Sequence, residues 1–291
     1  MLPGPLNLNA LSLKHAIPSC GSHVLAVASL GDEVFVARSD SQKVDVYDAG
    51  TLSLQRSITV PGLGTQPYGL TACISNSCLY VSDYDNHSIH RAELAGDKVT
   101  KWYVASHPAG LSVNKAHNLV VVCCEESKLQ EYRTNGSLVR EICLDVGVMI
   151  PWHAVQLSSG DYVVSECTSP GVVSVVGVNG QIRQTTHGLS QTSAVGPMEH
   201  PRGLAVTKND EILVADEDNH RILSLTSSLN SIQELALRVD DGMHEPWYDE
   251  DGTPWYDDWI QQPLCLCLDE SRGRICVGEF AGGRVLVFGD V

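Results

Sequence analysis

Short apolar runs, mostly of Val, Ile, Leu and Tyr, recur along the whole chain and are separated by Gly, Asn, Asp or Ser. Their length of about five residues and their β-branched content are typical of strands, and no segment shows the 3.6-residue spacing of an amphipathic helix. Four such runs lie at residues 203–206, 211–215, 221–225 and 232–237. Four successive strands joined by short turns predict one four-stranded antiparallel sheet.

The same pattern occurs six times, with starts near residues 23, 67, 108, 151, 201 and 263. The steps between these starts are 44, 41, 43, 50 and 62 residues. A sheet of this kind buries its faces only against neighbouring sheets, so the repeats predict an all-β protein, a single six-bladed β-propeller domain over residues 1–291. A β-sandwich, the alternative architecture, does not account for the regular period.

The two ends of the chain complete each other in this scheme. The sixth repeat ends after three predicted strands, and residues 1–18 precede the first repeat with apolar residues at Leu6, Leu8, Leu11 and Leu13. We expect residues 1–18 to supply the outer strand of the sixth blade. This pairing removes an exposed sheet edge and joins the two ends.

Alternating strand direction sorts the connections between two faces of the ring. The turns between second and third strands lie on the same side as the connections into the next inner strand, and we call that side the upper face. The sequence places nine acidic residues there: Asp83, Asp85, Glu125, Glu126, Glu166, Asp216, Glu217, Asp218 and Glu279. The hairpins of the lower face carry Lys115, Lys208, Arg272 and Arg274. We therefore expect one strongly acidic face.

The connection from the fifth to the sixth repeat is unusually long. Residues 240–262 contain eight acidic residues and no Lys or Arg, with a near-duplication of EPWYDEDG as TPWYDDWI. We expect this insertion to form an acidic and aromatic rim on the upper face, where carboxylates and aromatic planes bind Lys or Arg of a basic peptide or protein surface. A solvated loop without a ligand is the alternative. The predicted partner-binding residues are Trp247, Tyr248, Asp249, Glu250, Asp251, Trp255, Tyr256, Asp257, Asp258, Trp259, Asp83, Asp85, Asp216 and Asp218.

Two repeats share a tighter motif, Pro-x-Gly-Leu followed by an apolar strand and Asp-x-x-Asn-His. Its residues are Pro67, Gly69, Leu70, Asp83, Asn86, His87 and Ile89 in the second repeat, and Pro201, Gly203, Leu204, Asp216, Asn219, His220, Arg221 and Ile222 in the fifth. This motif resembles the NHL repeat, which forms the C-terminal propeller of tripartite-motif proteins. The resemblance implies a six-bladed propeller with a binding face, and it raises the expectation of a substrate-recognition part in a ubiquitin-ligase-type assembly. Neither a zinc-binding Cys/His pattern nor a heptad repeat accompanies it.

Most residues of the motif have a structural explanation. Glycine at the third position of a repeat lets the innermost strand approach its neighbours where the ring is tightest. Asp216 and Asn219 fall in a turn, where short polar side chains cap the backbone. We therefore expect them to form the turn; one such Asp in each blade is also too sparse a ligand set for calcium.

Charge and composition narrow the function classes. The chain has 19 Lys and Arg against 35 Asp and Glu, for a net charge of -16. This balance argues against a surface that binds phosphates. The sequence shows no apolar window of membrane-spanning length and no secretory signal pattern, so we expect a cytoplasmic protein that does not associate with membranes and is a monomer.

Two of the repeats replace the third-position glycine with His153 and Cys265. We expect both to fill space, although a soft metal is the alternative. Cys73 and Cys78 flank a short turn and are expected to face each other as thiols. We expect Cys123, Cys124, Cys143, Cys265, Cys267 and Cys276 to occupy strand positions as small buried hydrophobic residues.

The sequence thus predicts a non-catalytic protein-interaction scaffold with no cofactor and no metal. One alternative is a metal-dependent hydrolase or lyase, such as the lactonases, esterases and amidating lyase that share the six-bladed fold. The second positions of the inner strands, where a catalytic cation would find ligands, hold Tyr68, Ala109, Trp152, Arg202 and Leu264, which supply no ligand set. A second alternative is an RNA-binding module, which would meet repulsion on the acidic face.

Overall fold

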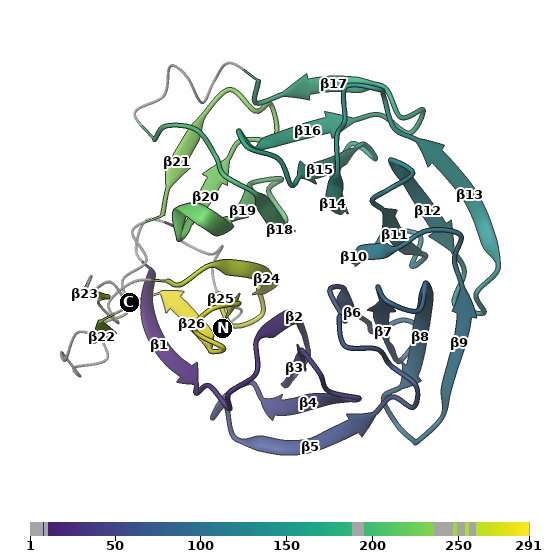
Figure 1. The fold of residues 1–291 in the computed structure, drawn as a ribbon, viewed down its shortest axis with the longest axis vertical. Helices are drawn as coiled ribbons and strands as arrows, with labels where there is room; N and C mark the ends of the chain where they lie inside the picture. Colours follow the sequence, from purple (N-terminus) through teal and green to yellow (C-terminus); the bar gives the residue numbers. More distant parts are fainter. Residues whose placement is uncertain are drawn as a thin grey trace.

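The structure is a computed structural model. It describes residue 8 and residues 11–187, 195–235, 247–248, 254–255 and 260–290, with the backbone alone at 247–248, 254–255 and 290. Six four-stranded antiparallel sheets are arranged as blades around a central axis (Figure 1). The predicted all-β, six-bladed propeller is confirmed.

In the first five blades the chain runs from the channel outward, so that the first strand is innermost. The first three blades comprise β2 (Val24–Leu30), β3 (Glu33–Arg38), β4 (Lys43–Asp48) and β5 (Leu54–Thr59); β6 (Leu70–Cys73), β7 (Cys78–Asp83), β8 (Ser88–Glu93) and β9 (Val99–Tyr103); β10 (Pro108–Val113), β11 (Leu119–Cys123), β12 (Lys128–Tyr132) and β13 (Leu138–Cys143).

The fourth and fifth blades comprise β14 (Pro151–Gln156), β15 (Tyr162–Glu166), β16 (Val172–Val176) and β17 (Ile182–Thr185); β18 (Pro201–Val206), β19 (Ile212–Asp216), β20 (Arg221–Leu225) and β21 (Ile232–Glu234). The sixth comprises β24 (Pro263–Asp269), β25 (Arg274–Glu279), β26 (Val285–Asp290) and, from the other end of the chain, β1 (Leu11–Ile17). A 3-10 turn, η2 (Glu217–Asn219), follows β19. In the described residues we find no helix with the length and hydropathy to cross a membrane.

The ring is closed by β1, which pairs antiparallel with β26 from Leu11 opposite Asp290 to Ile17 opposite Val285. Figure 1 shows β1 on the outer edge of the sixth blade, beside β26, with its arrowhead pointing toward the first blade. The predicted completion of the last blade by an N-terminal strand is confirmed. Ile17 is 1% exposed and packs in a cluster with Val24 and Val285, so it links the sixth blade to the first.

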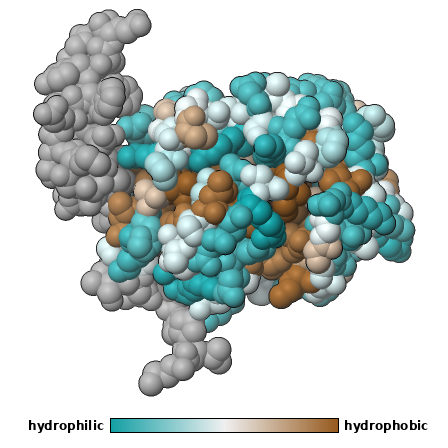
Figure 2. All heavy atoms as spheres, turned by 90° about the horizontal axis from the view of Figure 1, so that it is seen from below, coloured by the Kyte–Doolittle hydropathy of each residue, from teal (hydrophilic) through white to brown (hydrophobic). Residues whose placement is uncertain are grey.

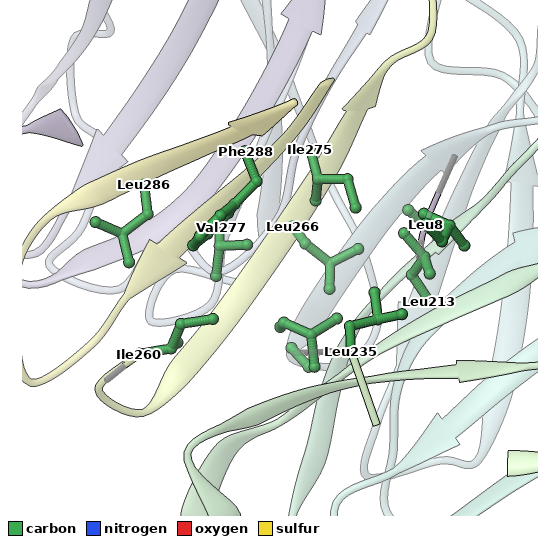
Figure 3. Close-up of a cluster of buried hydrophobic side chains, with 12 residues drawn as sticks. Leu8, Leu213, Leu235, Ile260, Leu266, Ile275, Val277, Leu286 and Phe288 are labelled. Carbon is green, nitrogen blue, oxygen red and sulfur yellow. The ribbon is translucent and has the colours of Figure 1, made fainter. Parts of the chain in front are cut away.

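Hydrophobic side chains fill the wedges between neighbouring blades. Between the fifth and sixth blades, Leu213 of β19 meets Leu266 and Ile275 of the next sheet (Figure 3). Leu8, upstream of β1, packs in the same cluster and is 8% exposed. The edge of the ring in Figure 2 is mostly hydrophilic, with hydrophobic residues gathered in patches across it. Each blade is therefore stabilised by its neighbours, as the repeat predicted.

The third-position glycines lie where inner strands come closest. A Cβ at Gly69 would lie 2.5 Å from the Ala109 carbonyl oxygen, and one at Gly110 would lie 2.7 Å from the Trp152 carbonyl oxygen. A Cβ at Gly203 would lie 2.8 Å from the Cα of Cys265. These neighbours are backbone atoms of the adjacent blade, so the space for a methyl group does not exist, as the sequence analysis expected.

Shortening the side chain that joins the two ends tests the closure. We expect Ile17→Ala to lower the free energy of unfolding by about 2–4 kcal/mol, since a buried aliphatic side chain is replaced by a cavity. His15→Ala, on an exposed position of the same strand, should change it by less than about 0.5 kcal/mol. Chemical denaturation measures both. Equal stability of the two variants would show that β1 does not hold the ring together.

A methyl group in the innermost ring tests the close approach. We expect Gly110→Ala to lower the free energy of unfolding by about 1–3 kcal/mol, because the backbones of two blades must separate. Gly50→Ala is the matched control, since the nearest atom to its Cβ would be the Asp48 carboxylate at 3.2 Å, the end of a side chain that can move. Thermal unfolding of the two variants compares them. A Gly110→Ala protein as stable as wild type would contradict this explanation.

Candidate functional site

A carboxylate ends the second strand in four of the six blades. Asp83, Glu166, Asp216 and Glu279 are each at most 2% exposed. Each accepts a hydrogen bond from a backbone N–H of the connection that enters its blade, with donors Gly64 (3.1 Å), Met149 (2.8 Å), Glu199 (2.7 Å) and Gln261 (2.7 Å) respectively. These carboxylates hold the upper-face connections in position.

Side chains of the third strand complete this arrangement. His90 Nε2 lies 3.2 Å from Asp83, and Arg221 Nε donates to Asp216 at 2.7 Å. Burial alone would raise the pKa of Asp83, but hydrogen bonds led by those from His90 and Asn86 outweigh it and lower the pKa. The charge of the Asp83 carboxylate is therefore stabilised within the blade.

The Asn and His of the sequence motif belong to the same turns. Asn86 and Asn219 donate to Asp83 and Asp216 at 3.0 and 2.9 Å. His220 closes its turn in the left-handed conformation, and its Nδ1 accepts a hydrogen bond from the Gln262 N–H of the next connection at 3.1 Å. The motif thus forms the turn and ties it to the following blade, in agreement with the structural role expected from the sequence.

Two blades depart from the carboxylate pattern. Arg38 takes the position in the first blade, opposite Val24, and Cys123 takes it in the third, opposite Pro108. Arg38 is 4% exposed and donates to the carbonyl oxygens of Gly283 at 2.7 Å and Ser22 at 3.3 Å. In the first blade, therefore, a cation at the end of the second strand donates to backbone carbonyls, whereas in four of the other blades a carboxylate accepts from backbone N–H groups. This first blade is next to the point where the ring closes.

A channel of about 360 Å³ runs along the axis and is lined by the inner strands of all six blades. Most of the residues that line it are Ala, Val, Leu or Gly. Three polar side chains, His153 in the lining and Ser82 and Ser165 behind it, link neighbouring inner strands. Ser82 donates to the Ala109 carbonyl at 2.9 Å, and Ser165 donates to the Arg202 carbonyl at 2.6 Å. These bonds satisfy backbone groups that the adjoining bulges leave free.

His153 is the third link. Its Nδ1 accepts from the Leu204 N–H at 2.9 Å and its Nε2 lies 3.0 Å from the Leu111 carbonyl, so it joins the third blade to the fifth as a neutral ring. Burial lowers the pKa of His153. Both nitrogens are occupied, and no group of three or more His, Cys, Asp or Glu in the described residues is arranged to hold a metal. His153 thus occupies the space next to the neighbouring inner strands and also links them through hydrogen bonds, which the sequence does not predict.

Three aromatic rings surround the upper end of the channel. Tyr68 meets Tyr84 edge-on, with centroids 5.4 Å apart and planes at 86°, and meets Trp152 at 5.0 Å and 64°. The Arg202 guanidinium lies over the Trp152 ring, 4.1 Å from its centroid. Arg202 also donates to Glu217. We call Tyr68, Tyr84, Trp152, Arg202 and Glu217 the channel mouth.

The charged groups of the channel mouth, Arg202 and Glu217, are largely shielded from solvent. Burial raises the pKa of Glu217, although Arg202 opposes this shift. Burial, together with Cys124 and Glu125, raises the pKa of Tyr84 to about 12, and burial also raises the pKa of Tyr68. Both phenols therefore stay neutral at physiological pH. The channel mouth presents aromatic faces and neutral hydroxyl groups around one ion pair.

Exposed carboxylates surround the channel mouth. Glu125 has a side chain 61% exposed and lies 3.0 Å from His107 Nδ1, and Asp218 is 43% exposed and lies 2.6 Å from His200 Nδ1. Asp85 is exposed and accepts from the N–H groups of Thr65 and Gln66 at 2.8 and 3.1 Å. We call Asp85, Glu125 and Asp218 the acidic rim.

The structure separates the predicted partner-binding residues into groups. Asp85 and Asp218 lie in the acidic rim, whereas Asp83 and Asp216 are fully buried and bind backbone inside the blades. We therefore leave Asp83 and Asp216 out of the partner-binding surface. Asp249, Glu250, Asp251, Tyr256, Asp257, Asp258 and Trp259 lie outside the described residues.

The near-duplicated segments of the insertion pair with each other. β22 (Trp247–Tyr248) and β23 (Pro254–Trp255) form an antiparallel ladder, with Trp247 opposite Trp255 and Tyr248 opposite Pro254. In the view of Figure 1 this pair of strands is outside the circle of blades. The repeat inside the insertion thus forms a hairpin-like pair of its own, a feature that the sequence analysis recorded only as a duplication.

Basic residues of the lower face link neighbouring blades. Lys115 Nζ donates to the Ser158 carbonyl at 2.8 Å, between the third and fourth blades. Arg272 pairs with Asp32, and Arg274 donates to the Ala49 carbonyl at 2.6 Å, both between the sixth blade and the first. These cations are engaged in the fold, which weakens the case for a lower-face patch that binds phosphates.

The ten cysteines, all within the described residues, are free. Cys73 lies opposite Cys78 across the β6–β7 hairpin, as predicted, and both are buried. Cys123, Cys124 and Cys276 are buried too, and Cys265 and Cys267 are partly buried. Cys143 is exposed, so the expectation of a buried hydrophobic role is wrong for Cys143.

From the sequence, Tyr68, Trp152 and Arg202 are recognisable only as inner-strand residues that supply no metal ligand. The signal that would have found the site is the second position of each repeat, where Tyr68, Trp152 and Arg202 stand in place of the small or aliphatic Ala109 and Leu264. Tyr84 and Glu217 follow directly after the buried carboxylates Asp83 and Asp216. Both sets of positions converge at the same end of the channel.

Comparison with known proteins agrees with this architecture. The NHL repeat family model matches residues 199–223, which span β18, β19 and the start of β20. The chain is a six-bladed β-propeller that carries an NHL repeat in its fifth blade. A search of the curated protein sequences finds no match.

Solved structures share the fold at low sequence identity. A streptogramin B lyase is 12% identical, with a TM-score of 0.65 and coverage of 97% of this chain and 98% of that chain. Virginiamycin B lyase from Staphylococcus aureus is 10% identical, with a TM-score of 0.65 and coverage of 97% and 100%. Hydrazine synthase from Kuenenia stuttgartiensis is 14% identical, with a TM-score of 0.63 and coverage of 93% and 96%. These likenesses establish the fold alone.

The neutral state of His153 makes stability depend on pH. Its pKa is lowered in the folded protein, so the unfolded chain binds the proton first and stability falls as the pH drops below 6.5, the ordinary histidine value. We expect His153→Gln to remove this pH dependence. The free energy of unfolding of the variant, relative to that of wild type, should then rise by at most about 1.4 kcal/mol for each pH unit below 6.5. Urea unfolding between pH 8 and pH 5 measures the effect.

The exposed His15→Gln serves as the control and should track wild type over the same pH range. Parallel pH profiles for wild type and His153→Gln would show that His153 takes up a proton as readily in the folded protein as in the unfolded chain, contrary to the hydrogen bonds described.

Proposed function

We propose that this propeller is a non-catalytic interaction scaffold that binds a basic peptide or protein surface on its upper face. The observation that carries the proposal is the channel mouth, where three aromatic rings lie at the end of the channel and are surrounded by the acidic rim. Tyr68 and Tyr84 are partly exposed and Trp152 is buried beside them. Aromatic rings next to carboxylates are the kind of surface to which Lys and Arg side chains bind. The net charge of -16 adds long-range attraction for a basic partner.

The upper face is also pre-organised for binding. Its connections are held by buried carboxylates and its inner strands by Ser82, Ser165 and His153, so little ordering is required when a partner arrives. The NHL repeat supports a scaffold role at the level of the fold. A place in a ubiquitin-ligase-type assembly, and a cytoplasmic location, stay predictions.

A lyase is the alternative, because the solved structures with this fold include a streptogramin B lyase and a virginiamycin B lyase. The channel mouth holds titratable groups, Glu217 and two tyrosines, that are able to transfer protons. The described residues offer no metal-binding cluster, and Glu217 is already paired with Arg202. The geometry therefore favours binding over catalysis.

Charge reversal on one face at a time tests the proposal. We expect Glu125→Lys/Asp218→Lys to weaken binding of lysine- and arginine-rich peptides by roughly tenfold or more, since attraction at the acidic rim becomes repulsion. Asp97→Lys/Asp161→Lys makes the same change in net charge on lower-face turns and should leave the affinity within about twofold. Fluorescence anisotropy with labelled peptides at 0.15 M salt gives both affinities.

Equal losses in the two double variants would mean that peptides bind through overall charge and not through the upper face. Conversion of virginiamycin B by the wild-type protein, detected by mass spectrometry, would overturn the non-catalytic assignment.

A further inference from the structure

The connection that leads into the fourth blade exposes three aliphatic side chains on the upper face. Val146 is 99% exposed, Met149 61% and Ile150 52%. We call Val146, Met149 and Ile150 the aliphatic loop. Exposed apolar side chains gathered on one connection are typical of a surface that a partner covers.

The backbone of the aliphatic loop is held in place. Met149 N–H donates to Glu166 at 2.8 Å, the Ile150 carbonyl accepts from Cys167 N–H at 3.0 Å, and Val148 is buried between these residues. Ile150 has a φ of 48°, a left-handed conformation that is unfavourable for a β-branched residue. The surrounding contacts thus hold a strained residue with its side chain half in solvent, which is the pattern of a pre-organised binding element.

The aliphatic loop is next to the channel mouth. Ile150 precedes Trp152 by two residues, and β14 begins at Pro151. Two residues of nearly extended chain span about 7 Å. A partner that touches both places therefore presents the two contacting side chains within about four residues of its own sequence.

The channel mouth is suited to a guanidinium group. Arg202 already shows that a guanidinium stacks on Trp152, at 4.1 Å from the ring centroid. Tyr68 and Tyr84 add further ring faces, and among the described residues the Tyr68 hydroxyl has no hydrogen-bond partner. A planar guanidinium stacks on aromatic rings and donates to hydroxyl groups and carboxylates at once, whereas the ammonium of lysine is compact and strongly hydrated.

We propose that the upper face recognises a two-point motif in its partner: one arginine side chain, which enters the channel mouth, and one or two aliphatic side chains within four residues of it, which pack on the aliphatic loop. The acidic rim selects the basic character of the segment. This inference rests on the proposed function and adds to it the chemistry of the partner. A purely lysine-rich segment satisfies the acidic rim but neither contact point.

Three acetylated, amidated hexapeptides separate the contributions: Gly-Arg-Gly-Leu-Leu-Gly, the same peptide with Lys for Arg, and the same peptide with Ser for both Leu. Isothermal titration calorimetry with the full chain measures their affinities. We expect the lysine peptide to bind about fivefold more weakly than the first, because it loses stacking at the channel mouth. The serine peptide should bind about tenfold more weakly, because it loses apolar contact with the aliphatic loop.

Protein variants assign each difference to its place. Tyr68→Leu should remove the preference for arginine over lysine, and Val146→Asp/Met149→Asp should remove the preference for leucine over serine. The matched control is Leu54→Asp/Val178→Asp, which changes exposed aliphatic residues of the lower face, 56% and 49% exposed, and should keep both preferences. Melting curves verify that every variant is folded.

The outcomes distinguish the two proposals. If the three peptides bind equally and all lose affinity on charge reversal of the acidic rim, the upper face binds basic segments and the two-point motif is wrong. If no peptide binds, the proposed function fails and the motif with it. Binding of single-stranded poly(U) in place of the peptides, with the same sensitivity to Tyr68→Leu, would overturn both in favour of an RNA ligand.

Discussion

The pairing of β1 with β26 is the interaction on which the rest of the structure depends. A propeller blade buries its two faces against neighbours, so a ring that fails to close leaves two blades with an uncovered face. Closure brings the sixth blade against the first, where Arg38, Arg272 and Arg274 donate to backbone carbonyls across the seam. Because the ring is closed, six inner strands converge on one channel and their first residues meet at its upper end.

The convergence of the inner strands at the channel has two consequences: it requires glycine at the closest approaches, and it brings the channel-mouth residues together. Close approach of the inner strands requires glycine at Gly69, Gly110 and Gly203, and where glycine is replaced, His153 uses the same narrow space to bond two other blades. The second position of each repeat, directly before the glycine position, is at the channel mouth and has room for a large side chain. Tyr68, Trp152 and Arg202 occupy this position in three of the blades. The blades are alike, but the side chains at the channel mouth differ from blade to blade.

The sequence was sufficient for the architecture because the repeat encodes it locally. Four short strands for each period and the alternation at Leu11 and Leu13 lead directly to six blades and to an N-terminal closing strand. The motif residues were also explained correctly, since Asn219 caps Asp216 through a contact three residues away in the chain. Burial was harder to predict: Asp83 and Asp85 are two residues apart, yet one is enclosed by its blade and the other reaches solvent.

The amino-acid sequence by itself determined the period, the strand order and the acidic character of the molecule, because these follow from local pattern and composition. The channel mouth was decided only in three dimensions. Tyr68 and Arg202 are 134 residues apart, with Trp152 between them, and no single repeat shows that the three side chains meet. They become one surface because blades of equal build rotate about a common axis, so that equivalent positions, distant along the chain, meet where the radius is smallest.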